Sequence, residues 1–413
     1  MKTLDIKFIS KRLRIYPLII LFTTWSIVLI NLATRDGWQG GFGQIIGSDF
    51  ITLYSAGVLY RQDIQNLYDL EAQAAVQQSL IEPTQLGGVN PFISPPHVAL
   101  AYTVFSVLPV LPAFISWSAL SLLLVGLSIP LLIRLIPPSS IFSNLSRSRW
   151  LILILAFFPF VLGWQVGQNH SLTLLLITAV VFLIFREKPI QAGFAAGLLI
   201  YKPQFALGFI ILWLVWSEYK ALIAFGITAA IWVAIPLINH GFEPYQQYLQ
   251  ISPLLLNLPY IEGFPGYLLV TIYGFLATLL PDSAAGILAK LVYPLMIIYG
   301  LALALLAYGS RTKPSRERIP VLILAVLYPL IASPYVLFHD LLVLFPVFVL
   351  WSYYRQQNRY LLISITLFYF GGLVLPIASF YFQVAIMVII PMAVFVGILK
   401  SIQIKPLNPL NTD

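Results

Sequence analysis

The feature that most constrains this chain is the placement of its few charged residues between long apolar runs. Only 9% of the 413 residues are charged and 60% are hydrophobic, whereas a soluble globular protein is about 25% charged and about 45–50% apolar. Short clusters of Lys and Arg flank one side of successive apolar runs, and isolated acids and histidines fall on the other. This pattern predicts an all-α polytopic membrane protein with one polar face.

The composition also excludes several classes of function. The net charge of +8 comes from basic residues that flank apolar runs and form no patch, so we expect no nucleic-acid partner. The chain has no cysteine, which excludes disulfides, thiolate metal sites and cysteine nucleophiles. It carries no phosphate-binding loop motif, no GxSxG motif and no dense cluster of metal ligands, so we expect no cofactor.

The first apolar run, residues 15–34, is long enough for a membrane-spanning helix, which needs about 20 residues. Lys7, Lys11, Arg12 and Arg14 precede it, and no small-residue cleavage site follows, so we interpret it as a retained helix and not as a signal peptide. Because Lys and Arg favour the cytoplasmic side, the N-terminus is expected there.

The next segment, residues 35–97, is net acidic and is expected to form a loop on the outer side of the membrane. Within Asp49–Leu80, apolar residues recur at roughly helical spacing, and neither Gly nor Pro occurs after Gly57. This stretch predicts one or two amphipathic helices that lie on the outer membrane surface.

The alternation of basic and acidic connections continues to the end of the chain. It predicts a single membrane domain over residues 1–413, with about twelve crossings and both termini in the cytoplasm. Two short apolar segments, Val98–Leu111 and Tyr267–Leu280, are expected to dip into the membrane without crossing it. The domain then divides into an N-terminal helical core at 98–238, a second outer loop at 239–283 and C-terminal membrane helices at 284–402.

Three predicted spans, 150–163, 192–200 and 205–216, are shorter than the roughly 20 residues of a full crossing. Irregular backbone at membrane depth is tolerated only where it lines a cavity or is buried in protein. Short helices that meet at polar turns therefore suggest a cavity in the outer half of the membrane.

Asp49 follows the first span within Gly47-Ser48-Asp49-Phe50. An Asp that precedes an apolar periodic run is often a helix N-cap. The alternative is a catalytic carboxylate, which at the membrane surface could accept a proton from a hydroxyl group in the transition state. Ser48 could act as the cap in its place.

Lys202 stands in the apolar stretch Gln191–Trp216 and precedes Pro203. An ionisable residue in such a stretch indicates a functional site. The predicted topology places this lysine on the outer side, where it could extend its ammonium group to the membrane interface. An anionic partner such as a phosphate explains it better, because an ammonium is a compact counter-charge.

Two further polar groups are expected on the same face. Gln168, Asn169 and His170 lie between two short apolar runs, as a solvated turn or as a hydrogen-bonding edge for a polar ligand. His339 and Asp340 are expected at an outer turn, paired with each other or with His339 held protonated against a phosphate.

The order of these motifs resembles glycosyltransferase family 87, the C-type membrane glycosyltransferases that include polyprenyl-phosphate-mannose-dependent mannosyltransferases. The resemblance covers about residues 15–350. It is carried by Ser48-Asp49-Phe50, Leu67-Tyr68-Asp69, Ser94-Pro95-Pro96, Leu111-Pro112 to Trp117, Gly167-Gln168-Asn169, Tyr201-Lys202-Pro203-Gln204, Ser333-Pro334-Tyr335 and His339-Asp340-Leu341.

The resemblance implies a C-type fold, a polyprenyl-phosphate-sugar donor and an inverting displacement on the outer face. Asp49 would be the general base, and Lys202 and His339 would hold the donor phosphate. Gln168 and Asn169 would line the sugar or phosphate site. Asp340 and Tyr335 would also belong to the donor site.

The chain departs from the family at two motifs. Ser94 stands where members often have Tyr, and His339 stands where they commonly have Tyr. These departures affect the donor contacts and leave the role expected of Asp49 unchanged.

The function expected from these observations is transfer of a sugar, with mannose as the first choice, to a lipid-linked or glycan acceptor at the plasma membrane. One base suffices for a single displacement, because the phosphate leaving group needs charge neutralisation and no proton. The main alternative is a transporter or flippase of a lipid-linked glycan, which would favour an internal repeat. A ligase of preassembled glycans is a further alternative.

Overall fold

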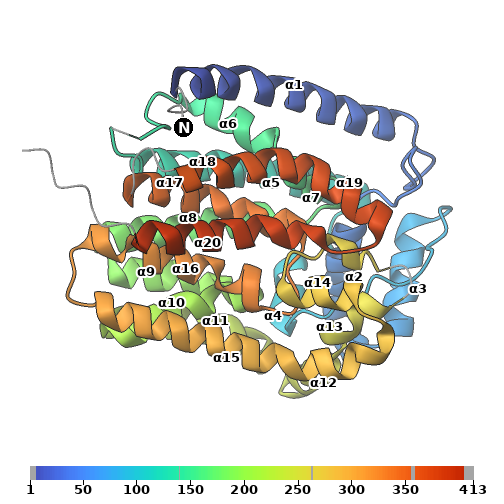
Figure 1. Cartoon of the computed structure of the whole chain (residues 1–413). Helices are drawn as coiled ribbons and strands as arrows, with labels where there is room; N and C mark the ends of the chain where they lie inside the picture. Colours follow the sequence, from blue (N-terminus) through green and yellow to red (C-terminus); the bar gives the residue numbers. More distant parts are fainter. Residues whose placement is uncertain (1–5, 139, 262–263, 355–358, 404–413) are drawn as a thin grey trace, which may run out of the picture.

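The computed structural model describes residues 6–138, 140–261, 264–354 and 359–403. This part of the chain is built from helices, and its β-type pairing is limited to isolated bridges. Most of the long helices run side by side along one axis, and the two long irregular segments gather at one end of the bundle (Figure 1). The predicted all-α class is therefore confirmed.

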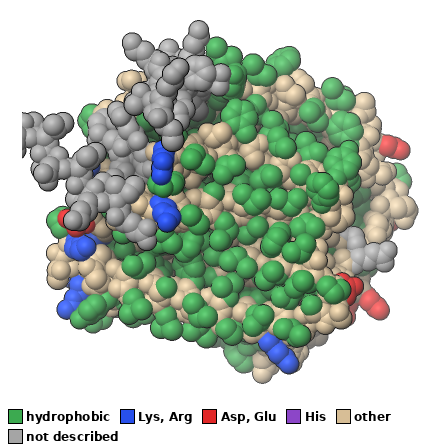
Figure 2. Space-filling model, in the orientation of Figure 1, with side chains coloured by type: hydrophobic (Ala, Val, Ile, Leu, Met, Phe, Trp, Pro, Cys, Tyr) green, Lys and Arg blue, Asp and Glu red, His purple; other side chains and the backbone are tan. Residues whose placement is uncertain are grey.

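Within the described residues, five helical segments are long and apolar enough to cross a membrane, and the first of them, at Ile15–Ala33, matches the span expected at 15–34. Between 22% and 39% of each is buried, so their outward faces are apolar, and Figure 2 shows this surface with most of its basic side chains at the left and most of its acidic ones at the right. The segments belong to α1 (Ile6–Ala33), α5 (Val110–Arg134), α11 (Tyr219–His240), α15 (Ala285–Ser310) with η5 (Asp282–Ala284), and α18 (Arg359–Thr366) with η7 (Leu367–Gly371) and α19 (Gly372–Phe382).

The span expected at 150–163 is wrong as a single helix. Two helices, α6 (Arg147–Leu155) and α7 (Phe158–Val166), meet there at a bend of 69°. Phe157 at the junction has an extended backbone, and Pro159 in the first turn of α7 cannot donate a backbone hydrogen bond to the preceding turn. The chain therefore breaks before it enters α7.

Short apolar helices make up much of the remaining bundle, as the short spans in the sequence predicted. They form the interior together with α16 (Ser315–Ala332), whose side chains are buried from Ile319 onward. A helix that is apolar on every side belongs in a core, and α16 packs against α10, α15 and α17. The short helices are α8 (His170–Phe185), α9 (Pro189–Gly197) with η2 (Leu198–Tyr201), α10 (Gln204–Trp216), η6 (Phe338–Val343) with α17 (Leu344–Tyr354), and η8 (Ile386–Val388) with α20 (Ile389–Gln403).

The segment expected as outer-loop helices does form helices, α2 (Ser48–Gln62) and α3 (Leu70–Ile81), with η1 (Ile64–Asn66) between them. The expectation that they are amphipathic surface helices is wrong for α2, which is buried on all sides from Phe50 to Gly57. The reason is an aromatic cluster in which the α2 side chains pack against the start of α5 and against α4 (Pro96–Tyr102).

The two segments expected to dip into the membrane contain only short helices. Helix α4 has 7 residues and α14 (Ile272–Leu279) has 8, so each is about 10–12 Å long and too short for a hydrocarbon core of about 30 Å. The rest of the second irregular segment consists of α12 (Glu243–Ile251), α13 (Leu254–Asn257), η3 (Leu258–Tyr260) and η4 (Gly266–Leu268).

The basic cluster near the N-terminus lies in α1. The side chains of Lys7, Lys11, Arg12 and Arg14 fall outside the described part of the structure. The cytoplasmic location of the N-terminus therefore stays a prediction.

Candidate active site

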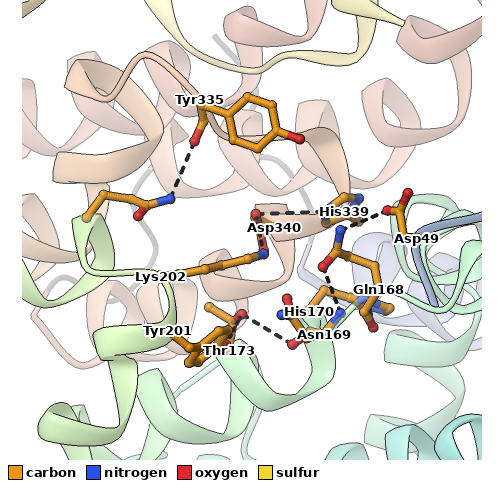
Figure 3. Close-up of polar contacts among 11 residues, drawn as sticks. Asp49, Gln168, Asn169, His170, Thr173, Tyr201, Lys202, Tyr335, His339 and Asp340 are labelled. Atoms are coloured by element: carbon orange, nitrogen blue, oxygen red, sulfur yellow. Dashed lines mark hydrogen bonds and ion pairs between the residues drawn. The ribbon is translucent and has the colours of Figure 1, made fainter. Parts of the chain in front are cut away.

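A cavity of about 350 Å³ opens where both irregular segments meet the ends of the short helices. Its lining comes from six separate parts of the chain and includes five of the polar residues that the sequence singled out, namely Gln168, Lys202, Tyr335, His339 and Asp340 (Figure 3). Its polar lining residues are Asn90, Ser94, Gln168, Tyr201, Lys202, Gln204, Tyr248, Tyr293, Ser333, Tyr335, His339 and Asp340.

Asp49, in the first turn of α2, does not itself line this cavity but lies behind its wall at one end. Its Oδ2 accepts a hydrogen bond of 2.8 Å from Nε2 of Gln168, and its Oδ1 accepts one of 3.2 Å from Nδ2 of Asn90. Both donors line the cavity. No side chain caps α2, so the expectation of a helix cap at Asp49 or Ser48 is wrong.

The surroundings of Asp49 change its acidity. Burial raises its pKa to about 6, while the hydrogen bonds from Gln168 and Asn90 act in the opposite direction. The charge of Lys202 lowers the pKa of Asp49 and that of Asp340 raises it, so the two ends of the cavity interact electrostatically. A carboxylate with a pKa near 6 is deprotonated at neutral pH and is a stronger base than an ordinary Asp.

Two glycines bring Asp49 against Gln168. Gly167 has a left-handed backbone with φ of 76°, and a Cβ atom there would lie 2.5 Å from Cβ of Phe50. Gly47 also has a positive φ, and its backbone N–H donates to the carbonyl oxygen of Gln165 at 3.0 Å. Only glycine fits such a close approach in this conformation, so this contact fixes the start of α2 beside the turn that carries Gln168.

Asn90 is a site residue that the sequence reasoning missed. Gln77 holds it from both sides, since Gln77 Nε2 donates to the Asn90 carbonyl at 2.8 Å and Gln77 Oε1 accepts from the Asn90 backbone N–H at 3.2 Å. The hydroxyl of Thr52 donates to the same carbonyl at 3.1 Å. No signal in the sequence indicated this arrangement, because it depends on the burial of Gln77 in the folded protein.

At the other end of the cavity, Lys202 forms an ion pair with Asp340. Nζ of Lys202 donates to both carboxylate oxygens, at 2.8 and 3.0 Å. The side chains are 15% and 4% exposed, so the alternative in which Lys202 extends to the membrane interface is wrong. Lys202 leaves the helical conformation at the junction of η2 and α10, because the following Pro203 disfavours it there.

His339 lies next to this ion pair inside η6, and its side chain is buried. Its Nε2 is 3.8 Å from Oδ2 of Asp340, so their mutual pairing is loose and Lys202 is the main partner of Asp340. His170 lies close by, with its ring centroid 5.9 Å from that of His339.

Two expected residues have different surroundings. Tyr335 lines the cavity, and its carbonyl oxygen accepts a hydrogen bond of 3.5 Å from Nε2 of Gln204. Asn169 is buried behind the wall and is not part of the lining, although its backbone N–H binds Oε1 of Gln168 at 2.9 Å. Its carbonyl accepts from Thr173, which is hydrogen-bonded to Tyr201 of the lining.

The arrangement brings together a base, Asp49 at the cavity wall, and a cation, Lys202 in the cavity lining, whose charge is neutralised by Asp340. Asp49 can take a proton from a hydroxyl group, and the side chains around Lys202 can interact with an anion. No group of three or more potential metal-ligating side chains occurs in the described residues.

Comparison with known proteins identifies the family of the chain. The sequence model of glycosyltransferase family 87 matches residues 92–334. This range contains Gln168 and Lys202 and ends one residue before Tyr335. No curated protein and no solved structure matches the chain. On the strength of the family match, which covers more than half of its length, the chain belongs to glycosyltransferase family 87 and is a membrane glycosyltransferase.

Proposed function

We propose that the enzyme transfers a sugar, with mannose as the first choice, from a polyprenyl-phosphate donor to a hydroxyl group of a lipid or glycan acceptor. The observation that carries the proposal is one cavity with Lys202, His339 and Asp340 in its lining, whose wall residues Gln168 and Asn90 hold Asp49, with a pKa raised to about 6, directly behind them. We place the reaction on the outer face of the plasma membrane, because the two irregular segments that enclose the cavity carry the acidic connections.

In this mechanism Asp49 removes the proton from the acceptor hydroxyl as its oxygen attacks the anomeric carbon. The bond between that carbon and the phosphate oxygen breaks, and the polyprenyl phosphate leaves with the bonding electrons. The attack and the departure occur on opposite faces of the sugar, so the configuration inverts. One carboxylate is enough, because the phosphate leaves without protonation.

The donor phosphate would bind near Lys202 and His339. Lys202 is the cation of the cavity lining, but Asp340 already neutralises it through both carboxylate oxygens. A phosphate would therefore share the ammonium with Asp340 or displace one of its two contacts. His339, adjacent to Asp340, could donate a further hydrogen bond once its ring reorients.

An apolar groove supports a lipid-linked donor. It has a volume of about 480 Å³ and runs between α10 and α15, lined by Leu214, Ile297, Leu301 and other apolar side chains. Tyr293 and Met296 line both this groove and the polar cavity. Ile297 and Leu301 are 60% and 61% exposed, as expected of a face in contact with membrane lipid. A prenyl chain could lie here while its phosphate reaches the cavity.

The proposed topology has about twelve crossings, with both termini in the cytoplasm. The five long segments, the bent pair, the five shorter apolar helices and α16 would together supply these crossings. The helices of the core are shorter than a full crossing, which fits a cavity that reaches below the outer surface.

The test is sugar transfer by the purified full-length protein with radiolabelled polyprenyl-phosphate-mannose and a membrane lipid extract as acceptor. Labelled GDP-mannose serves as the alternative donor. The proposal expects product from the prenyl donor alone and no product with Asp49→Asn. Transfer from GDP-mannose, or equal transfer by Asp49→Asn, would refute the donor class or the base respectively.

A further inference from the structure

A second cavity lies at the end of the bundle opposite the candidate active site. Its volume is about 470 Å³, and it forms where three helix connections meet, those from α8 to α9, α10 to α11 and α15 to α16. Nothing in the proposed sugar transfer uses it. It belongs to the end where Figure 2 shows most of the exposed basic side chains of that face.

Three cationic side chains line this cavity, namely Lys188, Lys313 and Arg318. Arg318 is fixed in place, because its Nε donates to the carbonyl of Lys313 at 2.9 Å and its guanidinium lies 5.2 Å from the ring of Trp216. Lys188 has no ion pair in the described structure, and Lys313 has only a loose exposed contact of 3.9 Å with Glu317. Two lysines are therefore available for an anion.

Backbone dipoles add to this positive field. The N-termini of α9 and α16 both lie at the cavity; Ser315 at the start of α16 has a backbone N–H, whereas Pro189 at the start of α9 has none. The first N–H groups of a helix lack partners within the helix and favour negative charge. The cavity thus combines mobile ammonium groups with fixed donors, which suits a phosphate oxygen.

Two acidic residues, Glu187 and Glu218, also line the cavity. Glu187 is held by a hydrogen bond of 3.0 Å from the hydroxyl of Ser315, and its left-handed backbone (φ of 54°) fixes the connection from α8 to α9. A carboxylate beside a phosphate site can accept hydrogen bonds from hydroxyl groups of the same ligand.

The deeper lining is apolar. Trp213, Ile319 and Leu322 are buried, and each lies farther from its helix end than the charged residues do. Leu214 and Tyr219, next to the cavity in sequence, are 56% and 62% exposed, so a membrane-facing apolar surface reaches the charged mouth. A ligand at this boundary has both a polar and an apolar part.

We propose that this cavity binds the phosphate headgroup of an anionic, hydroxyl-bearing membrane phospholipid. Lys188 and Lys313 contact the phosphate, the headgroup hydroxyls bind Glu218, and the acyl chains lie along the exposed apolar face of α11, which carries Ile223 and Ile227. A soluble anion would gain nothing from the apolar boundary, whereas a lipid uses both parts.

Three helices connect this cavity with the candidate active site. Helices α8, α10 and α16 have one end at this cavity and the other at the candidate active site. Helix α8, with 16 residues, separates the two by about 24 Å. A bound headgroup would tie together the ends of the three helices that carry Gln168, Lys202 and Tyr335 near their opposite ends.

The test is native mass spectrometry of the full-length protein in detergent, titrated with phosphatidylglycerol, phosphatidylethanolamine or phosphatidylcholine. Glycerol 1-phosphate and inorganic phosphate are the tail-free probes. The charge-reversal variant K188E/K313E changes two exposed side chains. The matched control R147E/K220E changes two exposed basic residues at the same end that do not line the cavity.

The proposal expects one tightly retained phosphatidylglycerol, affinity lowered about tenfold or more in K188E/K313E, and little change in R147E/K220E. Equal loss in both double variants would mean diffuse electrostatic binding and would overturn the site. Tighter binding of phosphatidylethanolamine would overturn the anionic ligand, and equal binding of glycerol 1-phosphate would overturn the lipid source. The readout is binding, so it is independent of whether the enzyme uses a polyprenyl donor.

Discussion

The two ends of the active-site cavity stabilise negative charge by different means. Around Asp49, neutral amide groups of Gln168 and Asn90 hold the carboxylate, and burial raises its pKa to about 6. Around Asp340, a full positive charge on Lys202 holds the carboxylate at 2.8 Å. The first carboxylate is prepared to accept a proton, whereas the second is a fixed counter-charge.

The difference between the two carboxylates follows from the part of the fold in which each of them lies. Asp49 lies in the first irregular segment, where the side chain of Gln77 binds the backbone of Asn90 and the side chain of Asn90 binds Asp49. Asp340 and Lys202 lie among the apolar core helices, where an isolated charge would be costly and a paired one is tolerated. The comparison teaches that the same side chain serves as a base or as a structural ion according to whether its partner is neutral or charged.

The largest effect is expected for Asp49→Asn. Loss of a general base lowers the rate of transfer at least about 100-fold, while donor binding should persist because Lys202 is unchanged. A transfer assay beside a donor-binding assay checks both. If donor binding is lost together with transfer, Asp49 does not act as a separate base.

Stability provides a second readout on the same variant. The pKa of folded Asp49 is raised, so the folded protein binds more protons than the unfolded chain between about pH 4 and about pH 6. The wild type should therefore lose stability relative to Asp49→Asn as the pH rises through this window. Thermal unfolding at several pH values measures the difference.

Breaking the ion pair between Lys202 and Asp340 should lower the free energy of unfolding. Asp340→Asn leaves the charge of Lys202 without its partner in a mostly buried place, and we expect a loss of about 3 kcal/mol in the free energy of unfolding. The control is Lys313→Gln, which breaks an exposed ion pair whose side chains are 51% and 57% exposed, with an expected cost below about 1 kcal/mol. Equal costs in denaturant unfolding would contradict a structural role for the buried pair.

A smaller effect is expected at the glycine that joins the two parts of the Asp49 end. Gly167→Ala places a Cβ atom 2.5 Å from Cβ of Phe50 at a positive φ, and should cost about 2 kcal/mol. Gly226→Ala in α11 is the control, because its Cβ atom would meet no neighbour within 4 Å. There the change should stabilise by about 0.5–1 kcal/mol. The two variants should therefore shift the unfolding temperature in opposite directions.

The smallest effect is expected for Asn90→Ala. Removing one hydrogen-bond donor raises the pKa of Asp49 further, so the acidic limb of the pH–rate profile should move upward while stability falls by about 1 kcal/mol. Asn66→Ala removes a hydrogen bond to the exposed Asp63 and is the matched control. An unchanged profile in Asn90→Ala would mean that Gln168 alone positions the base.

The sequence predicted the helices and the residues of the site better than the contacts that these residues make with one another. Apolar runs and basic clusters indicated most helices, and the scarcity of charge made Lys202 and Asp49 conspicuous. The ion pair of Lys202 with Asp340 joins residues 138 positions apart, and no periodic pattern carries such a distance. Two opposite charges predicted on one apolar face were the signal that could have suggested it.

Other features depend on tertiary packing alone. The spacing of apolar residues in α2 suggested a surface helix, yet α2 is buried from Phe50 to Gly57, where it packs against aromatic side chains of α4 and α5. The bend before α7 follows from Pro159. Proline also occurs inside unbroken helices of this chain, for example Pro130 in α5, so its presence alone did not predict the bend. Asn90 looked like an ordinary loop residue, because its role depends on Gln77 across a turn of the chain.

The central claim is that Asp49 is the base of the sugar-transfer reaction. The most direct test is the pH dependence of kcat/KM for the wild-type enzyme with a polyprenyl-phosphate-sugar donor, whose phosphodiester does not titrate near neutrality. With a pKa of about 6 for Asp49, kcat/KM should be constant above about pH 7 and fall about tenfold per pH unit well below pH 6. A value that stays constant down to about pH 4.5 would contradict the claim, because a protonated Asp49 cannot accept the proton of the acceptor.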